Sequence, residues 1–394
     1  MSHRYRCETY PASRLAEIDR AAWEGVCDFA ANPFMDLRFL SVLHSALGPE
    51  SRFWAVLVRD EQQRAVAATY FCTYRIDAIP ALPEFLRPPS EWIRSWFRGY
   101  LKIPLLIVGQ PIGTGQGNLA FESDVDFAPL CEALDQAAKQ VARETRAKLI
   151  LFKEFEAPLA DRLEPLLQSG YTRMKSVLTY TLQADYRDFE HYYETRSKRT
   201  RANMRKVMAK ADEAAVICLQ LSGGDDVAKL HTDEVHQLYE NVRLRGEMQF
   251  EVVPAEFFRE LARQFPEQAR FTLLKAGEKV VGFCCGLSAG KRHTMLYCGI
   301  DYDVNEDAAV YFNTVYRGLA AALETSASEI NVGQSADEFK RRMGCEGRPL
   351  FMFLKPTGFV LSILFGVFRS VLFRNDTPVP AENATAASPS SADR

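Results

Sequence analysis

Residues 270–303 read RFTLLKAGEKVVGFCCGLSAGKRHTMLYCGIDYD. Apolar and polar side chains alternate in three runs of this segment, and Gly277 and Gly290 stand where the runs reverse. Alternation is typical of half-buried strands, and glycine is typical of tight reversals. The segment therefore predicts three consecutive antiparallel strands.

The apolar pattern changes its period after Asp301. Apolar residues then recur at helical spacing, and a short apolar strand covers residues 329–332. A strand, a helix and a second parallel strand place the end of the first strand and the start of the helix at one crevice. Crevices of this kind bind ligands, so we expect the functional site there. The apolar positions of the helix are Val310, Val315, Leu319 and Leu323.

An earlier part of the chain repeats this order of elements. Residues 12–48 are predicted to form two helices that are broken at Asn32 and Pro33, and residues 53–77 are predicted to form a hairpin. Helix, strand, helix and a last strand at 171–183 follow. Such a repeat argues for two copies of one unit. Four apolar positions recur 218 residues later, where Phe39, Leu40, Leu43 and Phe53 match Phe257, Phe258, Leu261 and Phe271.

Composition excludes several classes of protein. A length of 394 residues with 47% hydrophobic side chains is enough for two packed units, and the net charge of −3 gives no general attraction to nucleic acid. The nine cysteines lack paired spacing and the six histidines lie apart from them, which gives no zinc signature and favours a reducing compartment. The N-terminus lacks the apolar core of a signal peptide, and no apolar run reaches about 18 residues, so we expect neither secretion nor a membrane-spanning helix.

Two motifs lie near the start and the end of the second unit. Residues 197–206 read SKRTRANMRK within a run rich in Lys and Arg, and residues 339–344 read FKRRMG. Together with the order of strands and helices, they resemble the GNAT superfamily of acyltransferases. The similarity is greatest to the tandem, Fem-like (FemAB/CelD-like) branch of peptidoglycan-bridge and related N-acyltransferases.

The resemblance implies an α/β (α+β) fold of two tandem GNAT-like units, each a mixed β-sheet flanked by helices. We place the first unit at residues 1–185, with an amphipathic insertion at 80–107, and the second unit, expected to be the catalytic one, at 186–356. An amphipathic helix at 357–374 and a disordered tail at 375–394 are expected to follow.

The resemblance also places functional residues in the second unit. Basic residues on a helix can hold a phosphate or an anionic head group, although a solvated helix face explains them as well. Lys340 is the residue that we most expect in the site, where it would neutralise a phosphate or stabilise an oxyanion. The alternative is a solvated lysine beside Arg341 and Arg342. The expected substrate-binding residues are Arg201, Asn203, Arg205, Tyr239, Arg243 and Gln334.

Acyl transfer to an amine requires a neutral amine, a polarised carbonyl and a stabilised leaving group. Neutralising a lysine-like amine at pH 7 costs roughly 4–5 kcal/mol, so a carboxylate should lie near it. Asp301, Asp337 and Glu338 are candidates for that base. Tyr297 and Tyr316 are candidate donors to the leaving group, and aromatic packing explains both equally well.

Gln110, Gly113 and Gly115 have a Q-x-x-G-x-G spacing that resembles the pyrophosphate loop of the superfamily. Glycines in such a loop let backbone N–H groups approach phosphate oxygens. The next predicted helix begins only near Phe127, and an ordinary glycine-rich connection is the alternative. The expected donor is acyl-CoA or acyl-ACP, and no metal is expected.

Two segments mix apolar and basic residues at helical spacing, at residues 92–102 and 359–373. Such helices lie in the interface of a membrane, because rings favour the head-group level and cations favour anionic lipid. The alternatives are helices packed on the protein or at a dimer contact. The expected membrane contacts are Trp92, Trp96, Phe97, Phe365 and Phe368.

These interpretations predict a cytoplasmic, peripheral protein on the inner face of the membrane. It would transfer an acyl group from a thioester to an amine of a lipid or cell-envelope precursor, for example a ceramide-type or aminolipid acceptor. One alternative is a Fem-type peptidoglycan-bridge transferase that uses aminoacyl-tRNA, the only case in which a nucleic-acid partner is expected. The other is a non-catalytic GNAT-like protein that binds an envelope lipid or glycan.

Overall fold

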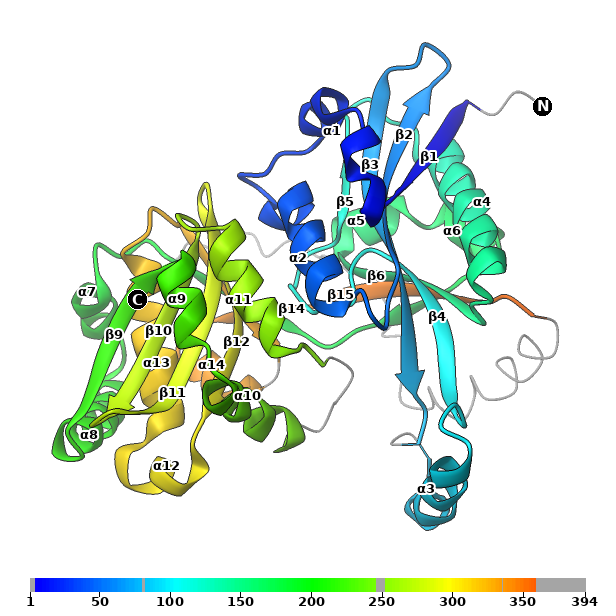
Figure 1. Ribbon diagram of the computed structural model, residues 1–394. Coiled ribbons are helices and arrows are strands. Elements are labelled where there is room, and N and C mark those ends of the chain that lie inside the picture. Colours follow the sequence, from blue (N-terminus) through cyan, green and yellow to red (C-terminus); the bar gives the residue numbers. More distant parts are fainter. Residues whose placement is uncertain (1–3, 80–81, 246–251, 335, 359–394) are drawn as a thin grey trace, which may run out of the picture.

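The computed structural model describes residues 4–79, 82–245, 252–334 and 336–358. These residues form two β-sheets flanked by helices, which lie side by side (Figure 1). The expectation of two mixed-sheet units is confirmed.

The first sheet contains strands from the first half of the chain and one strand from its end. Its parallel pair is β4 with β6, and the remaining pairs are antiparallel. The strand order is β1 (Tyr5–Pro11), β2 (Phe53–Asp60), β3 (Ala65–Asp77), β4 (Lys102–Val108), β6 (Leu149–Glu156), β15 (Leu350–Pro356) and β7 (Thr172–Lys175), and β5 (Leu119–Phe121) pairs with β3.

The second sheet contains the predicted three-stranded meander, β10 to β12, which is confirmed. Gly277 and Gly290 adopt φ of 59° and 51° at the two reversals, a conformation that glycine tolerates. The strand order is β14 (Glu346–Arg348), β8 (Thr179–Gln183), β13 (Glu329–Gln334), β12 (Arg292–Ile300), β11 (Lys279–Ala289), β10 (Ala269–Ala276) and β9 (Val216–Ser222).

The two units exchange a strand. β8, which directly follows the last strand of the first unit, pairs with β13 and β14 in the second sheet. β15, at the end of the second unit, pairs with β6 and β7 in the first sheet. The prediction of one last strand at 171–183 is therefore wrong. Strand propensity does not tell which sheet a strand joins, and residues 176–178 carry the chain from one sheet to the other.

Helices cover the faces of both sheets, and several begin at a side-chain cap. Asp126 accepts a hydrogen bond from the Ala128 N–H at the start of α4, and Ser197 accepts one from the Thr200 N–H at the start of α8. The helices are η1 (Ala12–Glu17), α1 (Arg20–Val26), η2 (Pro33–Met35), α2 (Leu37–Leu47), η3 (Glu84–Leu86), α3 (Arg87–Trp96), α4 (Phe127–Thr145), α5 (Ala157–Arg162), α6 (Pro165–Gln168), α7 (Phe189–Glu194), α8 (Lys198–Glu213), α9 (Asp225–Leu230), α10 (Asp233–Arg245), α11 (Ala255–Gln264), α12 (Tyr302–Ala308), α13 (Val310–Leu323) and α14 (Asp337–Arg342).

The units meet through α2 and α11, the two helices that the 218-residue repeat relates. The Phe39 ring lies 6.4 Å from that of Phe257 and 6.2 Å from that of Phe265, measured between ring centroids. All three side chains are buried within one hydrophobic cluster that includes both units. The repeated apolar positions therefore build the interface between the copies.

The predicted insertion at 80–107 contains two different structures. Residues 84–96 form η3 and α3 at the tip of an arm that β3 and β4 extend away from the sheet (Figure 1). Residues 102–107 instead belong to β4, which pairs with β3 and β6 inside the sheet. The insertion is thus shorter than expected, because its apolar end serves as a sheet strand.

The predicted C-terminal helix, with Phe365 and Phe368, and the predicted disordered tail lie outside the described residues from position 359 onward. Among the helices that the structure describes, none combines the length and the apolar character that crossing a membrane requires.

Candidate functional site

The two parallel strands of the second unit separate partway along their length. β12 pairs with β13 from Arg292 to Thr294 only. Directly beyond, Leu296 is an extra residue in β12, because Cys285 pairs with Tyr297 and Gly286 pairs with Met295. A bulge of this kind bends the strand that contains it and leaves backbone groups of the extra residue unpaired. Such groups can polarise a carbonyl, as the predicted chemistry requires.

Lys340 lies at this gap. Its Nζ donates a hydrogen bond of 2.6 Å to the backbone oxygen of Gln334, at the end of β13, and only 6% of the residue is exposed. Burial lowers the pKa of the Lys340 ammonium to about 8, although Cys298, Cys345 and Asp337 act in the opposite direction. A cation that is held by one carbonyl and removed from water is able to interact with an anion in the gap.

The first unit contributes a carboxylate to the same place. Glu154 accepts a hydrogen bond of 3.2 Å from Gln334 Nε2, and it is 5% exposed. Its backbone adopts φ of 61°, which is uncommon for a residue with a side chain and is often found at functional positions. Sequence reasoning missed Glu154. The available signal was a charged pair, Lys153 and Glu154, between apolar residues of the strand.

The glycine-rich loop lies between the units. A Cβ on Gly115 would come within 2.4 Å of both Asn331 Nδ2 and Thr179 Oγ1, so this position excludes a side chain. Gln110 is buried and Gly113 is half-buried. This packing accounts for a glycine at position 115 without a bound phosphate. Cofactor binding by Gln110, Gly113 and Gly115 stays a prediction.

The predicted leaving-group donors are packed among other rings. Tyr297 lies 5.5 Å from Tyr239 and 5.8 Å from Phe258, measured between ring centroids, on the side covered by α10 and α11. The Tyr239 hydroxyl accepts a hydrogen bond from the Val253 N–H at 3.2 Å. Tyr316 is buried beside Phe339, and burial raises its pKa to about 12, which keeps the phenol protonated at neutral pH.

The predicted bases occupy different surroundings. Asp301 caps α12 by accepting from the Asp303 N–H at 3.0 Å, and it also pairs with Lys279 at 2.7 Å, so its oxygens are engaged in structural contacts. Asp337 and Glu338 are exposed on α14. At the gap itself, the structure places Glu154 in contact with Gln334.

Some side chains of the basic helix α8 are hydrogen-bonded within the protein, and others are exposed. Arg201 donates to the Glu194 oxygen at 2.7 Å, and Arg205 donates to the Tyr193 hydroxyl at 3.1 Å. Asn203 is exposed. Arg243, on α10, is bonded to Glu240. Substrate binding by these residues stays a prediction, whereas Lys340 and Gln334 are in direct contact.

In the part of the chain that the structure describes, no three His, Cys, Asp or Glu side chains form a group that could hold a metal ion.

The fold defines the class of the protein. A tandem GNAT protein from the clavulanic acid biosynthesis pathway superimposes with a TM-score of 0.50 at 12% identity, over 90% of this chain and 99% of that one. A conserved protein of unknown function from Bacteroides thetaiotaomicron does so with a TM-score of 0.50 at 10% identity, over 86% and 98%. FemX matches with a TM-score of 0.49 at 11% identity, over 80% and 90%. The match to the tandem GNAT protein confirms two GNAT-like units in tandem as the fold.

The family follows from the sequence. The FemAB_like family model, described as peptidoglycan biosynthesis/recognition, matches residues 14–350. The chain belongs to this family, which confirms the Fem-like resemblance. A comparison with curated proteins finds no match.

Proposed function

We propose that the protein is an N-acyltransferase that uses the gap between β12 and β13. It would take an acyl group from acyl-CoA or acyl-ACP and transfer it to an amine of a lipid or cell-envelope precursor, for example a ceramide-type or aminolipid acceptor. The observation that carries this proposal is Lys340, a buried ammonium held at the point where the two strands separate.

Lys340 would stabilise the oxyanion that forms when the amine attacks the thioester carbonyl. A charge-assisted hydrogen bond in a site shielded from water is strong, because little solvent competes for it. The contact from Glu154 to Gln334 would fix the end of β13 and, through the Gln334 backbone oxygen, the position of Lys340 Nζ. The amine must lose a proton during the reaction, and Glu154 is the buried carboxylate in contact with this edge.

The experiment measures release of free thiol from long-chain acyl-CoA in the presence of a long-chain amine. We expect Lys340→Ala to reduce kcat/KM by about a hundredfold, which corresponds to roughly 3 kcal/mol of lost oxyanion stabilisation. Arg342→Ala is the matched control, since it removes an exposed cation from the same helix. Equal turnover in both variants would show that Lys340 is not part of the site.

Aminoacyl-tRNA is the alternative donor. The family description and the cationic helix α8 support this alternative. The two donors are separated by supplying acyl-CoA or a charged tRNA to the same protein and acceptor. Loss of transfer after ribonuclease treatment would assign the aminoacyl route instead of the thioester route. Binding of an envelope lipid without turnover of either donor would favour the non-catalytic alternative.

We further propose that the protein is peripheral on the inner face of the membrane. Trp92, Trp96 and Phe97 are 67%, 72% and 71% exposed at the end of the arm, where they can enter the head-group region. Trp92→Ser/Trp96→Ser should abolish co-sedimentation with phospholipid vesicles while leaving thermal unfolding unchanged, because the rings contact little else in the protein. Vesicle binding at the level of the unchanged protein would exclude the arm as the contact.

A further inference from the structure

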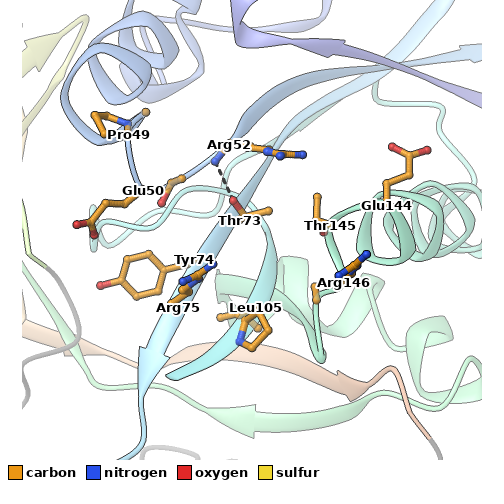
Figure 2. Close-up of a pocket in the computed structure, with 14 residues that line it drawn as sticks. Pro49, Glu50, Arg52, Thr73, Tyr74, Arg75, Leu105, Glu144, Thr145 and Arg146 are labelled. Carbon is orange, nitrogen blue, oxygen red and sulfur yellow. Dashed lines mark hydrogen bonds between the residues drawn. The ribbon is translucent and has the colours of Figure 1, made fainter. Parts of the chain in front are cut away.

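A polar pocket lies in the first unit, apart from the gap between β12 and β13. Its cavity volume is about 340 Å³, and its walls come from the connection between α2 and β2, the second half of β3, the start of β4 and the end of α4 (Figure 2). Arg52, Arg75 and Arg146 line it. With respect to the described residues, none of these three guanidinium groups makes a hydrogen bond or an ion pair, so all three are available to a ligand.

The charges that face this arginine pocket favour an anion. Two carboxylates, Glu50 and Glu144, line it against the three arginines. Glu144 accepts a hydrogen bond of 3.1 Å from Gln140, one turn back on α4. The remaining lining residues carry no formal charge, so the pocket has an excess of positive charge. Guanidinium groups bind phosphate with paired hydrogen bonds.

The backbone holds two of the arginines in place. The Arg52 N–H donates to Thr73 Oγ1 at 2.8 Å, and the Thr73 N–H donates to the Arg52 oxygen at 2.8 Å, which clips the start of β2 to β3 (Figure 2). Arg146 adopts φ of 57° as the C-cap of α4, and its N–H bonds to the end of that helix. The pocket walls are therefore ordered parts of the fold.

The pocket lies at the foot of the arm that carries α3. Arg75 pairs with Pro104 in the ladder of β3 and β4, and two residues further Asp77 pairs with Lys102, where the arm leaves the sheet. Arg94 of α3 forms an ion pair with Asp77, which braces the arm. The exposed rings of α3 and the arginine pocket thus belong to one end of the first unit.

The end of the described chain reaches the same place. β15 pairs with the start of β6 through Pro356 and Leu149, and the Thr357 N–H donates to the Lys148 oxygen at 2.9 Å. The Lys148 N–H in turn donates to the Pro104 oxygen at 2.7 Å, beside the pocket. The glycine-rich loop that follows Val108 leaves from the opposite end of β4.

We propose that the arginine pocket binds the phosphate of an anionic phospholipid while α3 enters the bilayer interface beside it. This inference rests on the peripheral membrane association proposed above. A lipid phosphate is the occupant that the position favours, because the pocket lies at the foot of the arm whose tip carries the exposed rings, and away from the gap where the thioester would react. The arm would supply attachment to any phospholipid surface, and the pocket would supply the preference for an anionic one.

The test compares vesicle co-sedimentation of the full chain on phosphatidylcholine alone and on phosphatidylcholine mixed with phosphatidylglycerol. Arg75→Gln/Arg146→Gln should weaken binding to the mixed vesicles by about tenfold or more, at roughly 1 kcal/mol for each arginine. Its binding to phosphatidylcholine alone should not change, because the choline ammonium already neutralises the phosphate of that lipid. The control, Arg20→Gln/Lys291→Gln, removes the same charge from exposed positions elsewhere and should leave both affinities within about twofold.

Other outcomes would overturn the inference. If the pocket variant keeps the full preference for phosphatidylglycerol, or if the unchanged protein shows no such preference, the pocket does not bind lipid phosphate. If coenzyme A raises the unfolding temperature of the unchanged protein but not of the pocket variant, and vesicle binding is equal, the pocket is a nucleotide-phosphate site. Thiol release with a soluble amine is measured in parallel, so that failure of the proposed enzyme activity is recognised separately.

Discussion

At the scale of single residues, Lys340 combines a charge with a buried position. Removing an ammonium from water disfavours its protonated form, which is why its pKa falls to about 8. If the protonated form stabilises the oxyanion, activity should decline as the pH rises through about 8. This decline follows from the lowered pKa and would be absent for an ordinary exposed lysine.

Lys340→Arg tests this pH dependence, because arginine keeps its charge throughout the accessible range. We expect the variant to have a lower kcat and no decline of activity near pH 8. The pH profile of thiol release provides the measurement. A decline that persists in the arginine variant would have to come from another group.

Lys340 should also lower the free energy of unfolding at neutral pH. The pKa of Lys340 is lower in the folded chain than the ordinary lysine value of 10.5, so the unfolded chain binds more protons between pH 8 and 10.5. The free-energy cost of burying the Lys340 ammonium is fully present below pH 8 and disappears as the pH rises through 10.5. Lys340→Met should therefore raise the free energy of unfolding at pH 7 by about 2 kcal/mol while abolishing turnover. Denaturant unfolding measures this gain, which Arg342→Met should not reproduce.

At the scale of elements, a glycine of the glycine-rich loop contrasts with a glycine of the turn between β10 and β11. Gly115, with φ of 68°, has no room for a Cβ, whereas Gly277, with φ of 59°, has nothing within 4 Å of that position. Gly277→Ala should cost only the backbone strain of about 1 kcal/mol. Gly115→Ala should cost roughly 3 kcal/mol or more, because Thr179 and Asn331 must also move.

Thermal and denaturant unfolding of the two variants supply the comparison. Equal losses would mean that the loop can shift away from β8 and β13 without cost. Coenzyme A binding should be measured on Gly115→Ala as well. Retained binding would remove the reason to assign this glycine to a phosphate.

The predicted elements succeeded where a local pattern was sufficient. The meander, the helix α13 and the strand β13 were expected at their observed places, since alternation and helical spacing are properties of consecutive residues. The predicted end of the insertion, at residue 107, differs from the structure, because residues 102–107 belong to β4. A strand buried on both faces is an apolar run without alternation, so its sequence does not distinguish it from the end of an amphipathic helix.

At the scale of the whole molecule, the exchange of β8 and β15 joins the units into one folding system. Each sheet depends on a strand that the other half of the chain supplies. A chain that ends at residue 349 should fail to fold its first sheet, because β6 and β7 lose the strand between them. The second unit should then fail as well, because it shares one hydrophobic cluster with the first. A chain that ends at residue 358 keeps this strand and should unfold in one transition.

Circular dichroism and tryptophan fluorescence of the two truncated chains test this dependence. Trp23 and Trp54, both in the first unit and buried, report on that unit directly. A folded second unit in the chain that ends at residue 349 would show that the units are independent.

Local sequence patterns were enough to predict the period of each element, the repeat of the unit, the family resemblance and a role for Lys340. These properties depend on neighbouring residues or on short motifs. Four other features became apparent only from the folded chain: Glu154 reaches Gln334, Asp301 is a helix cap, the two units exchange a strand, and three arginines from separate elements share one pocket. Contacts of this kind join residues far apart in the chain, and their energies depend on burial and geometry that no local pattern contains.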